Sequence, residues 1–233
     1  MRVLVACEES QAVTIELRKR GHEAYSCDLI PCSGGHPEWH TQGDVLPLLN
    51  GCGDEEEYFC TLDNKAHKIP MRWDMIIAFP PCTYMSKAGA RWMYPAAGNV
   101  SQDRLAKAMK AKEFFLKILN ANCDRIAIEN PIPLKIVGLP KPTQVVHPYQ
   151  FGHPYSKATC LWLKGLPLLE STEVVGFYKP FTPSNTSKFS RGYGGSCGVA
   201  HTALERAKTF PGIAKAMAEQ WGGKEVTNET ECN

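Results

Sequence analysis

The sequence lacks several features that would place it in other classes of protein. No apolar run approaches the length needed to cross a membrane, although hydrophobic residues make up 43% of the 233 residues. No signal peptide is apparent, because Met1 to Cys7 read directly as a buried strand, and we therefore expect a soluble, cytoplasmic protein. The ten cysteines are irregularly spaced, which favours reduced thiols over a disulfide framework.

A strong charge of either sign is also missing. There are 26 basic and 24 acidic residues, which gives a net charge of +2. A protein that grips long duplex DNA usually has a larger basic excess, because phosphate contacts dominate that affinity. Cations do cluster between Ser101 and Lys117, but such a cluster is more often a solvated helix face than a phosphate site. The net charge is therefore compatible with a nucleic-acid partner but does not by itself indicate one.

What the sequence does contain is an alternation of strand and helix patterns. Arg2–Cys7 is a short β-branched run, and Ser10–Arg20 has a helical pattern that Gly21 ends. His22–Cys27 then reads as a second strand that closes on Asp28. A strand, a helix and a strand in this order open a parallel, doubly wound sheet, so we predict an α/β fold with a mostly parallel sheet.

The rest of the chain continues this pattern. It predicts strands at Trp73–Phe79, Arg125–Glu129 and Ala158–Leu163, and helices from Ser101 to about Asn120 and at Ile213–Trp221. We expect the first of these helices to bury Leu105, Met109, Leu116 and Leu119. We expect residues 1–163 to form the core, with a polar insertion at 51–70 that contains a hairpin around Asp63-Asn64. Residues 164–210 read as a short irregular region, and residues 211–223 as a C-terminal helix that returns to the core.

Two strand ends carry residues suited to chemistry. In an open parallel sheet, ligands bind outside the carboxyl ends of the strands. The strand at 73–79 ends in Pro80-Pro81-Cys82, and the next strand ends in Glu129-Asn130-Pro131. One helix separates these strands, so a right-handed crossover should make them neighbours. We therefore predict that Cys82 and Glu129 face one pocket, although they are 47 positions apart.

The first two strand ends indicate the kind of cofactor. The first turn reads Cys7-Glu8-Glu9-Ser10 in place of a G-x-G-x-x-G loop, and two carboxylates there would repel a pyrophosphate. Asp28 follows Cys7 by 21 positions, near the spacing at which a carboxylate binds the ribose hydroxyls of an adenosine cofactor. This pattern disfavours NAD and FAD and suits S-adenosylmethionine, which has no phosphate and a positive amino group. The alternative for Asp28 is an ordinary carboxylate at a strand end.

Taken in order, CEES, CD, GD, PPCTYMS and ENP resemble the motif series of the carbon-5 cytosine DNA methyltransferases. The longer stretches PPCTYMSKAGARW, QFGHPYSKATCLWLKGLP and TFPGIAKAMAEQWG are similar to the small phage and prophage members of that family. The match runs from Val3 to about Trp221, which is nearly the whole chain. The resemblance implies a Rossmann-like, S-adenosylmethionine-dependent methyltransferase with DNA as its substrate and residues 164–210 as its target-contact region.

The resemblance also implies roles for particular residues. It assigns the nucleophile to Cys82 and the base-binding carboxylate to Glu129, with Asn130 beside it. The cofactor set is Cys7, Glu8, Glu9, Ser10, Asp28 at the ribose, Asp44 near the adenine, and Pro80. Lys157 completes the catalytic set, and no metal is expected.

Elementary chemistry supports a cysteine and a glutamate in these positions. Carbon-5 of cytosine takes a methyl group only after a thiolate has added at carbon-6 and made the ring enamine-like. Glu129 can accept from the cytosine amino group and, where burial raises its pKa, protonate ring N3. Uracil presents a carbonyl at that place, so a carboxylate favours cytosine. The alternative is a buried, inert Cys82 and a Glu129 with a purely structural role.

The sequence departs from the family at two functional places. The family's Gln-x-Arg-x-Arg strand supplies an arginine to the pyrimidine oxygen, whereas Gln150-Phe151-Gly152-His153-Pro154 contains none, so Lys157 or His153 would have to replace it. Only 46 residues separate Leu163 from Phe210, which is small for extensive groove readout. We therefore expect weak, salt-sensitive DNA binding with a short or relaxed sequence preference.

Other interpretations stay open at this point. The same chemistry could act on a free nucleotide or on RNA, or the chain could be a non-catalytic binding module with the same fold. An amino-group methyltransferase is disfavoured, because Cys82 stands where those enzymes have an aromatic residue. The ligand-like spacing of Cys27, Cys32, His36 and His40 permits zinc, but the glycines and proline between the histidines deny them a helix. Tyr84, Trp92 and Tyr94 could equally stack on a flipped base or belong to the core.

Overall fold

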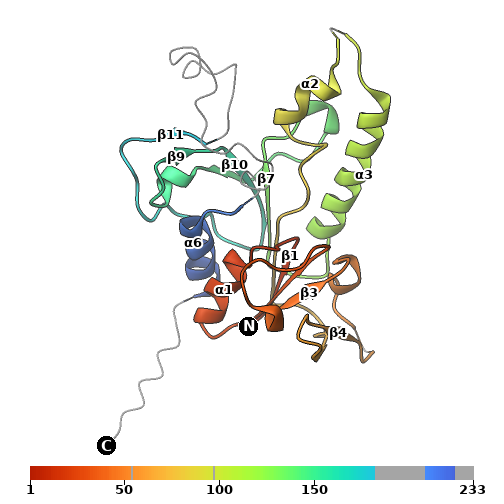
Figure 1. The fold of residues 1–233 in the computed structure, drawn as a ribbon, viewed down its shortest axis with the longest axis vertical. Helices are drawn as coiled ribbons and strands as arrows, with labels where there is room; N and C mark the ends of the chain where they lie inside the picture. The colour runs from red at the N-terminus through yellow and green to blue at the C-terminus, as the bar shows by residue number, and fades with distance from the viewer. Residues whose placement is uncertain (54, 97, 182–207, 224–233) are drawn as a thin grey trace, which may run out of the picture.

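A seven-stranded sheet runs through the centre of the computed structural model, which describes residues 1–53, 55–96, 98–181 and 208–223 (Figure 1). Its strands are β1 Arg2–Ala6, β2 Glu23–Asp28, β3 His40–Gln42, β6 Met75–Ala78, β7 Ile126–Pro131, β8 Gln144–Val146 and β10 Thr159–Lys164. Five of the strands (β1, β2, β3, β6 and β7) are parallel to one another, and β10 runs antiparallel to both of its neighbours, β7 and β8.

The order across the sheet is β3-β2-β1-β6-β7-β10-β8. When the seven strands are numbered along the chain, this order reads 3-2-1-4-5-7-6. A doubly wound sheet with a single reversed strand next to its edge is the arrangement of Rossmann-like methyltransferases, so the predicted fold class is confirmed. The order reverses between β1 and β6, and ligands bind at such a switch point, outside the carboxyl ends of the strands.

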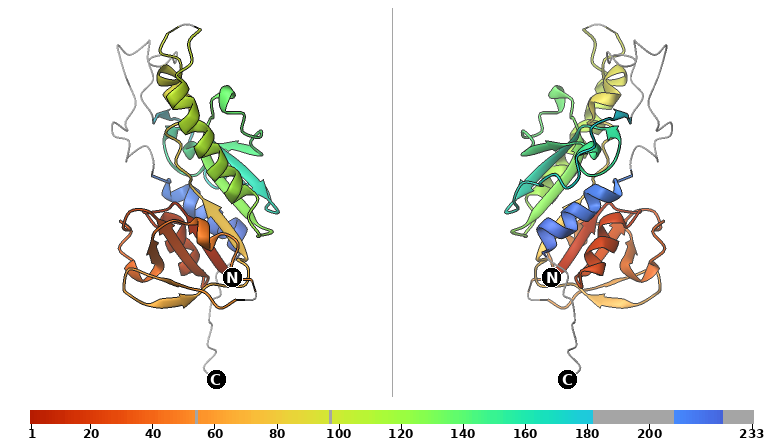
Figure 2. Two further views of the ribbon diagram at one scale, coloured as in Figure 1. Left: turned by 90° about the vertical axis from the view of Figure 1, so that its right-hand side faces the viewer. Right: turned by 90° about the vertical axis from the view of Figure 1, so that its left-hand side faces the viewer.

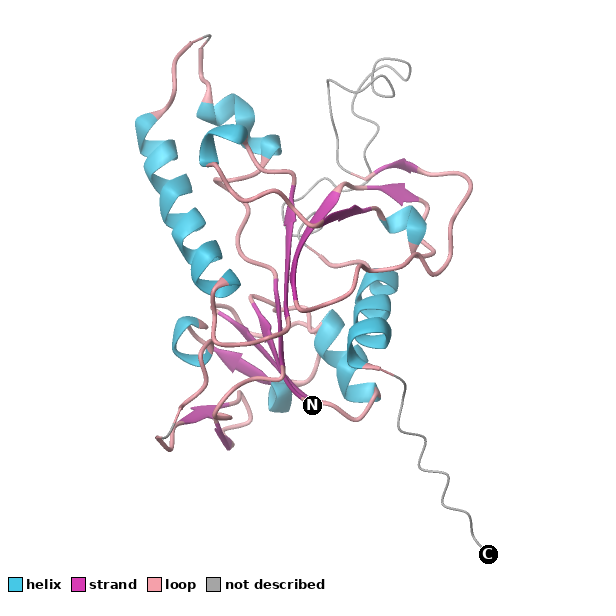
Figure 3. Ribbon diagram, turned by 180° about the vertical axis from the view of Figure 1, so that it is seen from behind, coloured by secondary structure: helices cyan, strands magenta, loops and turns pink. Residues whose placement is uncertain are grey.

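Helices cover both faces of the sheet. Helices α1 Ala12–Lys19 and α6 Pro211–Gly222 pack together on one face, and α3 Gln102–Leu119 covers the other (Figures 1 and 3). Figure 2 shows α3 nearest the viewer from one side and α6 nearest from the other. Alternate residues of β1 point to the two layers, Val3 and Val5 toward α1 and α6, and Leu4 toward α3. Burial on both faces explains why this strand reads as a continuous apolar run.

The face that α3 buries differs from the predicted one. Its fully buried side chains are Ala108, Phe115 and Ile118, while Met109 is 37% exposed, so the prediction for Met109 was wrong. The other three predicted residues, Leu105, Leu116 and Leu119, are partly buried at the edges of the contact. Phe115 determines the orientation, because its ring packs edge-on against Trp162 of β10 with centroids 5.0 Å apart. The predicted N-cap is confirmed, since the Ser101 hydroxyl accepts from the Arg104 amide.

The remaining elements are short. The predicted hairpin in the insertion is confirmed as β4 Tyr58–Cys60 paired with β5 Ala66–Lys68. A second small pair joins β9 Tyr155–Ser156 to β11 Lys179–Pro180. The other pieces are α2 Ala90–Met93 and the 3₁₀ turns η1 Pro37–Trp39, η2 Leu46–Leu48, η3 Lys87–Gly89, η4 Lys135–Val137 and η5 Pro148–Gln150. In the described ranges, no helix combines the length and apolar character needed to span a bilayer.

Candidate functional site

The two strand ends that carry Cys82 and Glu129 lie side by side. β6 and β7 are parallel neighbours with Ala78 opposite Ile128, as the crossover rule predicted. β6 ends just before the proline pair, and β7 continues past Glu129 to Pro131. The loop that carries Cys82 and the Glu-Asn-Pro segment therefore leave the same edge of the sheet.

Hydrogen bonds then join these two segments. The Asn130 amide donates from Nδ2 to the carbonyl oxygen of Pro80 at 2.7 Å, and the Asn130 side chain is only 1% exposed. Backbone bonds of 2.7 and 2.8 Å continue the junction between residues 85–87 and residues 132–134. Asn130 thus positions the loop that carries Cys82, so Asn130 has a definite structural role.

Cys82 itself begins a tight turn. Its carbonyl oxygen accepts from the amides of Met85 at 3.0 Å and Ser86 at 2.9 Å, and the residue is half-buried. On the other side of the loop, Arg104 of α3 donates from Nη2 to the Thr83 carbonyl oxygen at 2.7 Å. The loop is thereby held both from the sheet, through the Pro80 carbonyl, and from the helix, through the Thr83 carbonyl.

Sequence reasoning missed this role of Arg104, which it grouped with the cations of a solvated helix face. The guanidinium is half-buried and lies 5.2 Å from the centre of the Tyr84 ring. Gly89 leaves the space that the guanidinium occupies, since a Cβ there would stand 2.6 Å from Nη2. The signal available in the sequence was an arginine in the first turn of α3, the long helix after the loop that carries Cys82.

Glu129 lies next to Asn130 but on the opposite face of β7. Strand alternation places Glu129 with Ala127, on the side of α1 and α6. Burial raises the pKa of the Glu129 carboxyl, and the nearby Lys157 ammonium partly opposes this effect. The structure therefore brings Lys157 within electrostatic reach of Glu129.

Aromatic rings surround Lys157. Its ammonium lies 5.9 Å from the centre of the Phe181 ring and 5.8 Å from that of Phe210. These two rings contact each other edge-on with centroids 4.7 Å apart. His153, the other candidate for the missing arginine, is engaged elsewhere, because its Nε2 accepts from the amide of Gly212 at 2.9 Å. Of these two candidates, Lys157 is therefore the one whose charge acts on Glu129.

Three residues of the predicted cofactor set gather at the first strand ends. Cys7 follows β1 in a left-handed conformation, with φ of 58°. Burial raises the pKa of its thiol, and the carboxylates of Asp28 and Asp44 raise it further, so these carboxylates lie within electrostatic range of the thiol. Asp28 ends β2 and is half-buried, whereas Asp44 is exposed and accepts from the Leu46 amide at 3.0 Å. The amide of Phe79 donates to the carbonyl of Ala6, which links this end of the sheet to the segment that leads to Cys82.

Glu8 requires a correction. Its side chain is 3% exposed, and its carboxylate accepts from the Val13 amide at 2.6 Å and the Thr14 hydroxyl at 2.7 Å. Glu8 therefore caps the start of α1 and is not open to a cofactor. This capping contact stabilises the unpaired amides and the positive end of the helix dipole.

The other members of the predicted cofactor set range from half-buried, for Glu9 and Ser10, to buried, for Pro80. Glu9 accepts from the Ser33 hydroxyl, and Ser10 is half-buried with its carbonyl against Gly34, where a Cβ would clash at 2.6 Å. Pro80 is buried, and its carbonyl is the oxygen that Asn130 binds. Gln11, which sequence reasoning missed, is fully buried and ties this turn to the loop after β2 through two hydrogen bonds with the His36 backbone.

The metal interpretation finds no geometric support. The His36 ring stacks on Trp39 with centroids 3.8 Å apart, and its Nδ1 contacts Glu38. His40 is fully buried between the Ser26 hydroxyl and the Ile30 carbonyl. Within the part of the chain that the structure describes, no three His, Cys, Asp or Glu residues form a group that could hold a metal ion.

Comparisons with known proteins add little to this geometry. No protein-family model matches the sequence, and no curated protein matches it. Among solved structures, the chain is similar to a prophage-encoded protein of E. coli assigned as a DNA modification methyltransferase, with 13% identity and a TM-score of 0.40. The match covers 75% of this chain and 52% of the other, so this chain spans about half the length of that structure.

Proposed function

We propose that this protein is an S-adenosylmethionine-dependent methyltransferase that methylates carbon-5 of cytosine in DNA through a covalent adduct with Cys82. The observation that carries this proposal is the junction between the Cys82 loop and the end of β7, centred on the bond from Asn130 to Pro80. A junction of this kind keeps a nucleophile and a carboxylate, Glu129, at neighbouring strand ends. The Rossmann-like methyltransferase arrangement of the sheet supports the same reaction class.

The residues at the first strand ends fit the proposed cofactor. Asp28 would hold the ribose hydroxyls and Asp44 would lie near the adenine, while the Cys7 turn would border the methionine part. Carboxylates without a glycine-rich phosphate loop suit a ligand that has a cationic sulfonium and an amino group and lacks phosphate. When bound, S-adenosylmethionine supplies an electrophilic methyl group.

The protein's own residues would perform the remaining chemistry. The Cys82 thiolate adds to carbon-6 of cytosine, and the electron pair of the ring double bond moves toward carbon-5. Glu129 donates a proton to ring N3 as this happens, and its raised pKa keeps the proton available closer to neutral pH. After methylation, ring N3 returns its proton to Glu129. Loss of the carbon-5 proton to a water molecule then restores the ring double bond and expels Cys82 as a thiolate. Lys157 would stabilise the pyrimidine oxygen, in the place of the family's arginine.

DNA containing 5-fluorocytosine tests this proposal directly. Fluorine at carbon-5 leaves no proton for the final elimination, so the enzyme should form a stable covalent complex in the presence of S-adenosylmethionine. The complex should be visible as a denaturation-resistant band and by mass spectrometry. Cys82→Ser should abolish it, and Glu129→Gln should slow its formation by about 100-fold or more, the usual loss when a general acid is removed.

Controls make the result decisive. Cys160→Ser removes another cysteine near Glu129, and it should leave trapping intact. Trapping that survives Cys82→Ser would move the nucleophile to a different thiol. A wild-type protein that binds both cofactor and DNA without forming an adduct would refute the covalent carbon-5 mechanism and favour a non-catalytic binding module.

A further inference from the structure

The positive charge of this protein is concentrated in one stretch of the chain. Residues 83–117 contain five lysines and two arginines against Asp103 and Glu113, a net charge of +5. The whole chain carries +2, so the remaining residues together carry −3. The stretch begins directly after Cys82 and comprises η3, α2 and α3.

Not all of these cations are available to a partner. Arg104 is committed to the Thr83 carbonyl, Lys107 contacts Asp103 at 2.8 Å, and Lys117 contacts Glu113 at 3.1 Å. Lys87, Arg91 and Lys110 are exposed, and none of them forms a salt bridge with any residue that the structure describes.

The fold places this segment beside the nucleophile loop. α2 packs against α3, and the Ser101 amide before α3 donates to the Met93 carbonyl at the end of α2. Figure 1 shows α2 next to the upper part of α3, at one end of the molecule. The loop that carries Cys82 is fixed to the same elements, through Arg104 and through the Lys87 amide bond to Ile132.

Exposed aromatic rings accompany these cations. Trp92 is 57% exposed and Tyr94 is 41% exposed, so the core interpretation of these two residues is wrong. The Arg91 guanidinium lies 4.5 Å from the centre of the Trp92 ring system. Exposed aromatic rings next to unpaired cations are the combination that binds phosphates and stacks on bases. Tyr84, by contrast, is half-buried against the core.

We propose that Lys87, Arg91, Trp92 and Lys110 form the surface on which the backbone of a DNA duplex rests beside the Cys82 loop. The inference rests on the proposed function and adds to it the side from which the substrate approaches. The cations neutralise phosphates that flank the target base, and the Trp92 ring contacts the bases that are unstacked when the target cytosine leaves the helix.

The test measures binding of a fluorescein-labelled 20-base-pair duplex by anisotropy, without cofactor, over a range of salt concentrations. The variant Lys87→Gln/Arg91→Gln/Lys110→Gln is compared with Lys19→Gln/Lys65→Gln/Lys215→Gln, which removes the same charge from exposed sites on other elements. The patch variant should bind at least about tenfold more weakly at low salt, and its log–log salt slope should be smaller by about 2 to 3, since each phosphate contact contributes about 0.9. The control variant should bind within about twofold of wild type with an unchanged slope.

Each outcome decides between the hypotheses. Equal weakening in the two triple variants, or none in the patch variant, would overturn the assignment of this surface while leaving the proposed chemistry in place. A wild-type chain that binds no DNA would instead count against the proposed function. An RNA of the same sequence that competes ten times better than the duplex would overturn DNA as the partner of this surface. Trp92→Ala should weaken binding to a duplex with a mismatched target cytosine more than Trp92→Phe does.

Discussion

At the scale of single residues, the two neighbours Cys7 and Glu8 show how one turn serves two purposes. Cys7 lies within electrostatic range of the carboxylates of Asp28 and Asp44, which belong to the candidate cofactor site. Glu8 faces inward and caps α1 through Val13 and Thr14. Two adjacent carboxylates in the sequence, Glu8 and Glu9, therefore lie in different environments, and their pH behaviour should differ.

Glu8 should make the stability of the protein depend on pH. Burial raises the pKa of its carboxyl from 4.5 to about 7, against the hydrogen bonds from Val13 and Thr14. Between these values the folded state holds more protons than the unfolded state, so the stabilising contribution is fully present below about pH 4.5 and is lost as the pH rises through about 7. The shift corresponds to a change on the order of 3 kcal/mol in the free energy of unfolding.

Urea unfolding at pH 5 and pH 8 measures this contribution. The wild-type protein should lose most of this stabilising free energy between pH 5 and pH 8. Glu8→Gln has no titrating group at this position, so its free energy of unfolding should not fall in this way. Glu9→Gln is the matched control, because it removes the neighbouring carboxylate, which accepts from Ser33. It should keep the wild-type pH dependence. An equally steep decline in Glu8→Gln would refute the assignment to Glu8.

At the scale of elements, the bond from Arg104 of α3 to the Thr83 carbonyl holds the loop that carries Cys82. Arg104→Met should release the Thr83 carbonyl and loosen the turn, so that the amides of Met85 and Ser86 exchange hydrogen about tenfold faster, as expected for one lost charged hydrogen bond. Gly89→Ala should have a similar effect, because a Cβ would displace the guanidinium. Arg104→Lys should restore part of the protection.

The effects of Arg104→Met and Gly89→Ala on amide exchange should not be additive. With Arg104 already replaced by Met, Gly89→Ala has nothing left to displace and should change exchange by less than about twofold. Lys107→Met is the control one turn along the same helix, where the side chain is exposed, and it should leave the exchange of both amides unchanged. Additive effects would show that Gly89 acts on the loop independently of Arg104.

The same elements show which parts of the structure are predictable from sequence. The strands β1, β6, β7 and β10 appear in the sequence as largely apolar runs, and β2 appears as a short strand pattern that closes on Asp28. The crossover rule then places β6 beside β7. β3 and β8 have only three residues each and are strands because β2 and β10 pair with them, so a local pattern cannot show them.

The candidate site divides in the same way. The polar residues at the strand ends follow from the topology, since parallel strands bring their carboxyl ends to one edge of the sheet. The contacts of Arg104 and Gln11 depend on segments that come together from distant parts of the chain. The sequence can suggest Arg104 by its place in the first turn of a helix, but it cannot identify the partners of either residue. Glu8 was assigned to the cofactor because a carboxylate after a strand is equally suited to a ligand or to the helix that follows.

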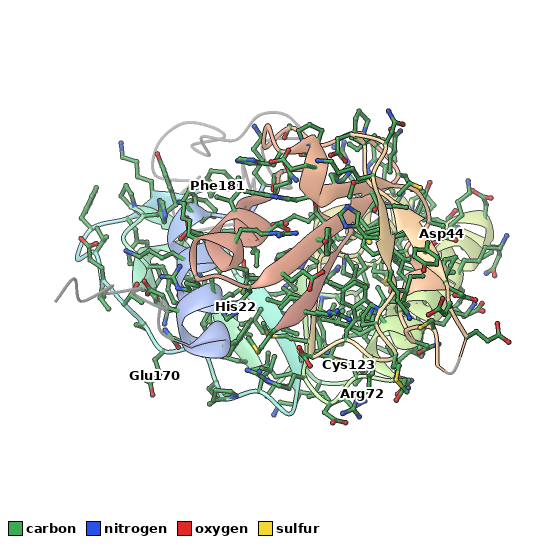
Figure 4. All side chains as sticks on the ribbon, turned by 90° about the horizontal axis from the view of Figure 1, so that it is seen from below. His22, Asp44, Arg72, Cys123, Glu170 and Phe181 are labelled. Atoms are coloured by element: carbon green, nitrogen blue, oxygen red, sulfur yellow. The ribbon has the colours of Figure 1, made fainter. Side chains whose placement is uncertain are left out.

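At the scale of the whole molecule, the sheet separates two groups of candidate site residues. Cys7, Asp28 and Asp44 belong to the half built by β1, β2 and β3, while Cys82 and Glu129 belong to the half built by β6 and β7. Seen from below, Asp44 lies far from Phe181, one of the rings around Lys157 (Figure 4). We therefore expect cofactor binding and thiol chemistry to be separable by mutation.

Thermal shift measurements with S-adenosylhomocysteine should show this separation. The ligand should raise the melting temperature of Cys82→Ser as much as that of wild type, since binding to the folded state alone stabilises it. Asp28→Ala should lose most of the shift. Asp124→Ala, which removes an exposed carboxylate just before the amino end of β7, should retain it. Stabilisation by NAD in place of the methionine cofactor would be incompatible with the proposed site.

The contact between Phe181 and Phe210 has a consequence for how such a protein can diversify. The chain departs at one ring and returns at the other, and these rings touch each other beside Lys157. The two ends of the chain between these rings are therefore fixed next to each other. Because each doubling of the length of a closed loop costs only about 0.6 kcal/mol, the number of residues between the two rings can change with little penalty to folding.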